Sequence, residues 1–198
     1  MKRIAVLLFA ISIAFASPAR AQSWEIAAMA GYVMPSDFAQ TTRDVDSAGI
    51  AGGVTYGFAA GYMFTPHWGA EAFWNAQSTA YQVEVNDVAG DLFSMTIHQV
   101  HGNLVYQFAQ RGTVQPFVFA GAGSTFFVAR DIPMETHFSM GLGGGVKVFP
   151  WKGVGVRGQF RYRPSWLSDS GGEFCDPFGF CQSMLRQLEF SGGVTFRF

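Results

Sequence analysis

Three sets of residues in this sequence could do chemistry. Cys175 and Cys181 are the only two thiols and could form a disulfide. Acidic and basic residues on alternate positions of several segments could form ion pairs or line a path for ions. Aspartates and glutamates between those segments could bind divalent cations, because Ca²⁺ and Mg²⁺ prefer carboxylate oxygens as ligands.

The two cysteines enclose the short segment DPFGF. Asp176, Pro177 and Gly179 occupy the first, second and fourth positions that a type I turn favours. Such a turn brings its flanks together, so we expect a disulfide between Cys175 and Cys181; free thiols and a metal or redox site are the alternatives. Closing so short a loop would contribute about 2 kcal/mol of loop entropy, which stiffens a loop rather than holding a domain together.

Neither the glycine runs nor the histidines predict a cofactor. The runs at 121–123 and 141–145 precede no helix, which a phosphate-binding loop requires, so we expect wall glycines that leave room for large side chains. His98 and His101 lie three residues apart, on opposite faces of a strand, and are too few to bind a metal alone. The sequence therefore predicts no cofactor and no metal centre.

The elements that position these residues repeat with a period of two. Segment 153–163 has one apolar and one polar parity: Val154, Val156, Phe160 and Tyr162 against Arg157, Gln159, Arg161 and Arg163. Successive side chains of a strand point to opposite faces, whereas a helix would place apolar residues at i, i+3, i+4 and i+7. Eight such segments emerge, although segment 116–127 is apolar on both parities and leaves its register open.

The connections between the eight segments alternate in length. Short links lie at 65–67, 110–114 and 150–152, and long links lie at 35–51, 83–91, 129–135 and 164–182. This pattern is typical of an all-β, eight-stranded, antiparallel up-and-down transmembrane barrel of the outer membrane. The rival is a soluble eight-stranded barrel, which would bury its apolar residues inside and expose its charges. In a membrane, reversing the faces of segment 153–163 would turn Arg157 and Arg161 into lipid, at a cost of about 4–8 kcal/mol for the two. The polar parity must therefore face the lumen.

The charged residues of the polar parity should therefore lie inside the barrel. An eight-stranded barrel is just wide enough for side chains to fill it, and buried charges must be paired. We expect an internal network of salt bridges, with a narrow conducting path as the alternative, formed by Glu25, Glu71, Lys147, Arg157, Arg161, Glu189 and Arg197.

Acidic residues gather in the long connections. Eleven of the 14 acidic residues lie in or beside them, against only Arg43 and Arg130 clearly in the same regions. We expect either a solvated rim or a site for divalent cations or a basic surface partner, with Asp44, Asp46, Asp87 and Asp91 as its candidate residues.

The composition differs from that of a soluble domain. The 198 residues suffice for one domain; 49% are hydrophobic and only 14% are charged, against about 25% charged in soluble domains. This excludes disorder, and a net charge of −1 argues against a nucleic-acid partner.

The first 21 residues have the pattern of a signal peptide. Two basic residues, Lys2 and Arg3, precede the apolar run 4–16, and Ala19-Arg20-Ala21 has the form of a cleavage site. Residues 22–198 then form the barrel domain.

Several segments carry a resemblance to a known family. GNLVYQF at 102–108, PFVFAGAGS at 116–124, FSMGLGGGVKVF at 138–149 and the closing SGGVTFRF resemble the small eight-stranded outer-membrane barrels of the OmpA/OmpX-like family. The resemblance implies location in the bacterial outer membrane, contact with its lipids, and recognition of the terminal strand ending at Phe198 by the barrel assembly machinery. It implies a structural or adhesin-like role through four external loops, with a small-solute channel as the alternative.

A lipid-modifying enzyme is a third and weaker interpretation. His137 and Ser139 resemble the His-x-Ser of outer-membrane lipid A deacylases, but Met140 stands where that family has Asn. Both residues fall on the lumen parity, and the next strand carries no Glu near them. We therefore expect two polar residues lining the upper lumen and no enzymatic activity.

Overall fold

The computed structural model describes residues 23–42, 45–85, 88–109, 112–129, 134–166 and 184–198. Within these ranges the chain forms ten strands, all paired antiparallel. The described residues contain no helix long and apolar enough to cross a membrane. The strands are β1 (Ser23–Val33), β2 (Ser36–Thr42), β3 (Val45–Ile50), β4 (Gly53–Met63), β5 (Trp68–Val85), β6 (Val88–Gln107), β7 (Val114–Ala129), β8 (Glu135–Trp151), β9 (Val154–Trp166) and β10 (Met184–Arg197).

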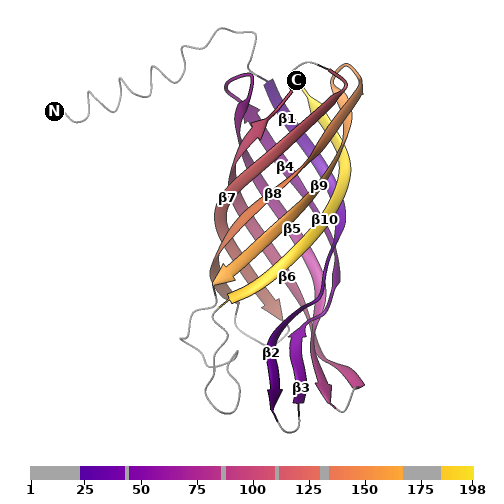
Figure 1. The fold of residues 1–198 in the computed structure, drawn as a ribbon, viewed down its shortest axis with the longest axis vertical. Coiled ribbons are helices and arrows are strands. Elements are labelled where there is room, and N and C mark those ends of the chain that lie inside the picture. Colours follow the sequence, from indigo (N-terminus) through magenta and orange to yellow (C-terminus); the bar gives the residue numbers. More distant parts are fainter. Residues whose placement is uncertain (1–22, 43–44, 86–87, 110–111, 130–133, 167–183) are drawn as a thin grey trace, which may run out of the picture.

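Eight of these strands close into a barrel, as the sequence predicts (Figure 1). The ring runs β5-β4-β1-β10-β9-β8-β7-β6 and is completed by the pairing of β6 with β5. The first and last strands are joined at their tips, where Trp24 and Phe198 exchange backbone hydrogen bonds of 3.3 and 2.9 Å. Every barrel strand therefore has two neighbours, which satisfies the backbone groups that lipid could not.

Two of the four connections expected as long loops contain further strands. The connection predicted at 35–51 forms the hairpin β2–β3, and β5 and β6 continue to Val85 and from Val88 through most of the predicted loop at 83–91. Beyond the long-loop end of the barrel, β3 pairs with β5 from Ile50↔Tyr81 to Ser47↔Glu84. The four strands β2, β3, β5 and β6 thus form a sheet that projects beyond the barrel at its long-loop end (Figure 1). Because backbone groups favour pairing over exposure wherever a partner strand is at hand, these connections extend the sheet.

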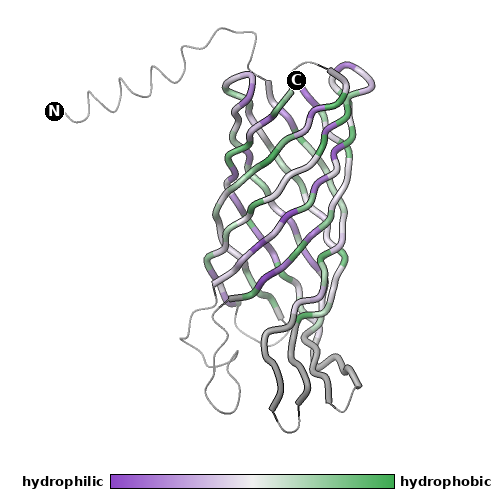
Figure 2. The backbone as a smooth tube through the Cα atoms, viewed as in Figure 1, coloured by the Kyte–Doolittle hydropathy of each residue, from purple (hydrophilic) through white to green (hydrophobic). Residues whose placement is uncertain are grey.

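The alternation of faces follows the parity read from the sequence. Hydrophilic and hydrophobic residues alternate along the barrel strands (Figure 2). Phe117 and Phe119 are buried inside while Val118 between them is 43% exposed on the outer face, which fixes the register of the strand that the sequence left open. Polar residues are buried and large apolar residues are exposed, the arrangement expected of a membrane barrel.

Inward glycines of β8 make room for the long side chains of β9. Gly143 pairs with Arg161 in the ladder, and Gly145 pairs with Gln159. A Cβ on Gly143 would lie 2.7 Å from Phe119, and one on Gly141 would lie 3.0 Å from Nη1 of Arg161. The glycine run therefore leaves lumen volume for guanidinium and aromatic groups, as expected from the sequence.

Candidate functional site

The lumen of the barrel holds most of the charged side chains that the structure describes. At the short-turn end, Glu25 on β1 accepts hydrogen bonds from both Lys147 on β8 and Arg197 on β10. The Arg197 Nη2 atom lies 2.6 Å from the carboxylate, and Arg197 also donates to the amide oxygen of Gln115 on β7. One carboxylate thus joins two cations from different strands across the end of the barrel.

The second ion pair lies between β5 and β9. Glu71 accepts two hydrogen bonds from Arg157, of 2.5 and 3.3 Å, and a third of 3.1 Å from the Asn103 amide. Arg157 also donates to Gln159 at 2.9 Å. Both partners of this pair are at most 5% exposed, so the bidentate geometry compensates a buried charge on each side.

The third ion pair links β9 and β10 and includes a residue outside the predicted network. Arg163 donates to Glu189 at 3.1 Å, and its Nη1 lies 3.3 Å from the Asn75 side-chain oxygen. The Asn75 amide in turn donates to Glu189 at 3.0 Å. Arg163 has the lumen parity in the sequence, but its position next to Pro164 placed it at the edge of a predicted loop.

Arg161 differs from the other lumen cations. It is fully buried, and within the described part of the chain no carboxylate lies within 4 Å of it. Its guanidinium carbon lies 3.8 Å from the ring centre of Phe73 and 4.3 Å from that of Phe119. Its hydrogen bonds to side chains of the described residues are long, at 3.5 Å to His101 and 3.5 Å to Asn103. Two aromatic rings therefore stabilise this charge in place of a carboxylate.

A cluster of hydroxyl groups and His101 lies further toward the long-loop end. The Nε2 atom of His101 lies 2.8 Å from Oγ of Ser139, which also accepts a hydrogen bond of 3.0 Å from Thr125. His137, the other residue of the His-x-Ser pair, contacts Glu135 at 3.1 Å. Both His137 and Ser139 are buried on the lumen side, where acyl chains of the surrounding membrane do not reach them.

The long-loop mouth of the lumen is apolar, which the alternation of parity does not predict. Inward residues at this end form one buried cluster, and the amides of three glutamines form a chain of hydrogen bonds of 3.1 Å each across the lumen. The apolar cluster consists of Ile50, Met95, Ile97, Phe127 and Leu185, and the amide chain consists of Gln99, Gln187 and Gln77. Ile50 comes from the β3 strand, so the projecting sheet contributes one residue to this cluster.

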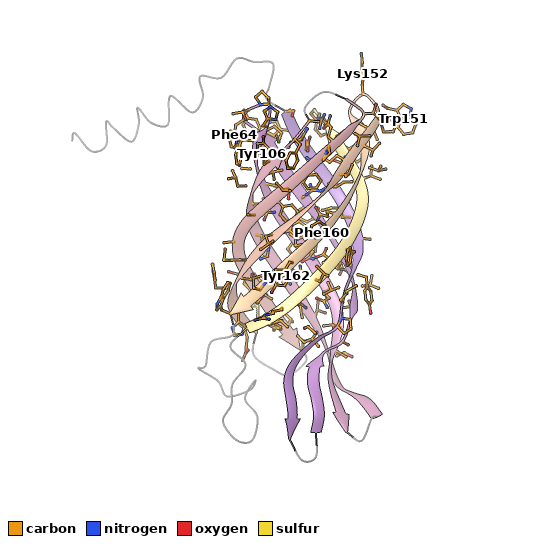
Figure 3. All side chains as sticks on the ribbon, in the orientation of Figure 1. Phe64, Tyr106, Trp151, Lys152, Phe160 and Tyr162 are labelled. Carbon is orange, nitrogen blue, oxygen red and sulfur yellow. The ribbon has the colours of Figure 1, made fainter. Side chains whose placement is uncertain are left out.

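Aromatic side chains surround the outer surface at the short-turn end. Trp24 packs on Tyr62 at 4.9 Å, and Trp68 packs on Tyr106 at 4.8 Å between ring centres. Phe64, Tyr106, Trp151 and Lys152 lie at this end, and Phe160 and Tyr162 lie further along the barrel (Figure 3). The outer surface therefore carries an aromatic girdle of the kind that outer-membrane barrels place at the lipid interface.

Several predicted residues fall outside what the structure describes. Cys175, Cys181, Asp44 and Asp87 lie outside the described residues, as does the segment 1–22. For Asp46 and Asp91 only the backbone is described: Asp46 lies on β3, and Asp91 pairs with Gln82 in the projecting sheet. Among the described residues, no three His, Cys, Asp or Glu side chains come together in a way that could hold a metal ion.

Residues 5–198 match the family model described as outer membrane protein beta-barrel domain. The chain belongs to this family. No curated protein matches the sequence.

Solved structures share the fold at low sequence identity. Neisserial surface protein A is 15% identical with a TM-score of 0.64, over 88% of this chain and 97% of that chain. OprG from Pseudomonas aeruginosa is 14% identical with a TM-score of 0.61, over 90% and 96% of the two chains. The N-terminal barrel domain of Pseudomonas aeruginosa OprF is 16% identical with a TM-score of 0.52, over 89% and 97%.

Family and fold together place the protein in the bacterial outer membrane. Barrels of this membrane direct short turns to the periplasm and long connections to the exterior. The projecting sheet of β2, β3, β5 and β6 therefore lies outside the cell, and the Glu25 ion pairs lie near the periplasmic mouth.

Proposed function

We propose that the protein is a surface-interaction protein, with adhesin-like contacts made by the extracellular sheet and the loops around it. The observation that carries the proposal is a filled lumen beneath a sheet that extends past the membrane. The barrel then serves as an anchor, and the external strands are the part that a partner can reach.

The packing of the lumen argues for an anchor rather than a conduit. The largest side chains that are fully buried include Arg161, Arg163, Phe117, Lys147 and Leu185, all directed into the barrel. Ion pairs cross the lumen, and a cluster of buried apolar residues lies inside it toward the extracellular end. A solute would have to break several of these contacts at once, so a small-solute channel is the weaker candidate.

The distribution of charge favours a cationic partner. The three acidic residues outside the long connections are Glu25, Glu71 and Glu189, and each is neutralised inside the barrel. The other eleven lie in or beside the external connections with few cations near them in sequence. The exterior of the protein is therefore acidic, and we propose that it contacts divalent cations or a basic surface.

Neutralising four external aspartates tests this proposal. Cells that produce the variant with Asp44, Asp46, Asp87 and Asp91 all changed to Asn should adhere less to a polylysine-coated surface than cells with the wild type. The control variant keeps the charge and changes neutral residues of the same connections: Gln40→Asn, Thr41→Ser, Ser47→Thr and Gln82→Asn. Adhesion of the aspartate variant at the wild-type level, with equal amounts of folded protein at the surface, would contradict the proposal.

Limited proteolysis separates divalent cations from a basic surface as the partner. If the external carboxylates bind Ca²⁺ or Mg²⁺, either ion should slow cleavage of the external connections, and the four-aspartate variant should lose this protection. Cleavage that is the same with Ca²⁺, Mg²⁺ and chelator leaves the basic surface as the partner.

Three further expectations go with this function. We propose that Cys175 and Cys181 form a disulfide that stiffens the last external loop. We propose that the barrel assembly machinery reads the outward apolar residues of β10 that end at Phe198, of which Val194 and Phe196 are each 43% exposed. We also expect no catalysis, because the His101–Ser139 pair is sealed inside the lumen.

A further inference from the structure

The charges inside the described lumen do not balance. Away from its mouth, five basic residues face three acidic residues: Lys147, Arg157, Arg161, Arg163 and Arg197 against Glu25, Glu71 and Glu189. Glu135, at the long-loop mouth, is 31% exposed and pairs with His137. Lys147 and Arg197 share one carboxylate, whereas Arg157 and Arg163 each have one of their own. Arg161 is left without a carboxylate, deep inside the barrel where an uncompensated charge is costly.

The two neighbouring guanidinium groups of β9 also have unused donors. The Nε and Nη2 atoms of Arg161 and the Nε and Nη2 atoms of Arg163 are buried and have no hydrogen-bond partner. Arg161 and Arg163 are two residues apart on one strand, so both side chains enter the lumen from the same face. Their exposures are both 0%, which keeps bulk water from satisfying these four nitrogen atoms.

The environment of Arg161 directs its donors to one kind of ligand. The Arg161 guanidinium carbon lies over the rings of Phe73 and Phe119, and the five N–H groups of a guanidinium are all donors. The aromatic rings stabilise the charge but offer no oxygen or anionic acceptor to these donors. A small anion at the edge of the group would satisfy the donors and reduce the charge excess, whereas a water molecule would satisfy donors only.

From these observations we infer that the lumen contains a binding site for a small inorganic anion of the halide class, held by the Arg161 and Arg163 guanidinium groups. The site is enclosed by the apolar cluster on the extracellular side and by the Arg157–Glu71 pair on the periplasmic side. An anion enclosed in this way becomes part of the folded barrel, incorporated when the barrel closes. The site is independent of the external surface to which we assign partner binding.

Bromide is the probe that tests this inference, because its anomalous scattering identifies it in a crystal. The protein is refolded in detergent in sodium bromide and crystallised, and the expected result is an anomalous peak within hydrogen-bonding contact of Arg161 or Arg163. Arg161→Met should lose this peak. The control Arg186→Gln removes an exposed arginine of β10 and should keep it.

A solution measurement gives an independent readout. At a fixed high temperature, wild-type barrels refolded in sodium bromide should unfold several-fold more slowly than barrels refolded in sodium gluconate of equal ionic strength, because a ligand bound only to the folded state stabilises it. The R186Q barrels should behave as the wild type. Should R161M fail to fold, the wild-type crystal decides: a lumen without a bromide peak, with only water at both guanidinium groups, overturns the inference.

Discussion

At the scale of single residues, the stability of this protein depends on matching each inward charge or volume with its neighbour. Glu25 illustrates the charge, since one carboxylate compensates two cations from different strands. Gly143 illustrates the volume, since the absence of its side chain lets Arg161 and Phe119 fill the lumen. Single substitutions at these two positions test the two kinds of match separately.

Glu25→Gln should destabilise the barrel strongly. The substitution leaves Lys147 and Arg197 without their carboxylate, and breaking a buried pair by removing one partner costs about 3–5 kcal/mol. The free energy of unfolding is measured by tryptophan fluorescence during guanidinium denaturation in lipid vesicles. Glu135→Gln is the control, because this carboxylate is 31% exposed and pairs with a histidine, His137, rather than with a lysine or arginine of the described residues; it should lose about 0–1 kcal/mol. Equal losses for the two variants would mean that the Glu25 pairs do not stabilise the fold.

Gly143→Ala should lower the free energy of unfolding by about 1–3 kcal/mol, since overpacking forces neighbours to shift. The new Cβ would lie 2.2 Å from the Phe160 carbonyl oxygen and 2.7 Å from Phe119. Gly158→Ala is the matched control on the next strand, because a Cβ there meets nothing within 4 Å; its effect should stay below about 0.5 kcal/mol. The same denaturation measurement applies, and an unaffected Gly143→Ala barrel would contradict the role of the glycine run.

At the scale of the elements, parity explains most of what the sequence could predict. A period of two assigns every residue to one of two faces, so strands, their number in the barrel and the lumen position of Glu71 or Arg157 follow directly. Parity carries no information on contacts across the lumen, and therefore the partner of each charge and the isolation of Arg161 required the structure. Parity also missed two features at the extracellular end. The inward residues there are apolar rather than polar, and strands β2 and β3 extend the sheet outside the membrane rather than span it.

A charge on the outer face should cost stability according to its depth in the membrane. Val194 on β10 lies midway in sequence between Phe190 and the terminal Phe198, and Val114 is the first residue of β7; both are exposed apolar residues. Val194→Arg should destabilise the barrel by about 2–4 kcal/mol and Val114→Arg by about 0–1 kcal/mol. Denaturation in vesicles measures both values. A similar cost at the two positions would be inconsistent with the proposed placement of the aromatic girdle.

At the scale of the whole molecule, closure of the hydrogen-bonded ladder makes the barrel resistant to unfolding by detergent. Every barrel strand has two partners, and β5 with β6 completes the ring, so no backbone edge is open to detergent or lipid. Folded protein should therefore remain folded in SDS until it is heated, and unheated and boiled samples should migrate at different positions on a gel. A refolded sample that migrates identically with and without boiling would not be a closed barrel.

The filled lumen makes a further prediction for the molecule as a whole, namely that it does not conduct ions. Four ion pairs on three carboxylates, the guanidinium group over Phe73 and Phe119, and the apolar cluster lie along the lumen between the two mouths. An ion crossing the barrel would have to separate buried opposite charges, and also pass an apolar mouth without its hydration shell. Wild-type protein in a planar lipid bilayer should give no steady current steps.

A double variant tests whether the side chains in the lumen cause this. Phe119→Ala with Arg161→Ala removes two large side chains that lie together in the lumen and should raise the frequency of current events, whereas the outward Val194→Ala should leave the current unchanged. Regular, ohmic steps from the wild type would show that the lumen opens, and would favour the channel over the anchor.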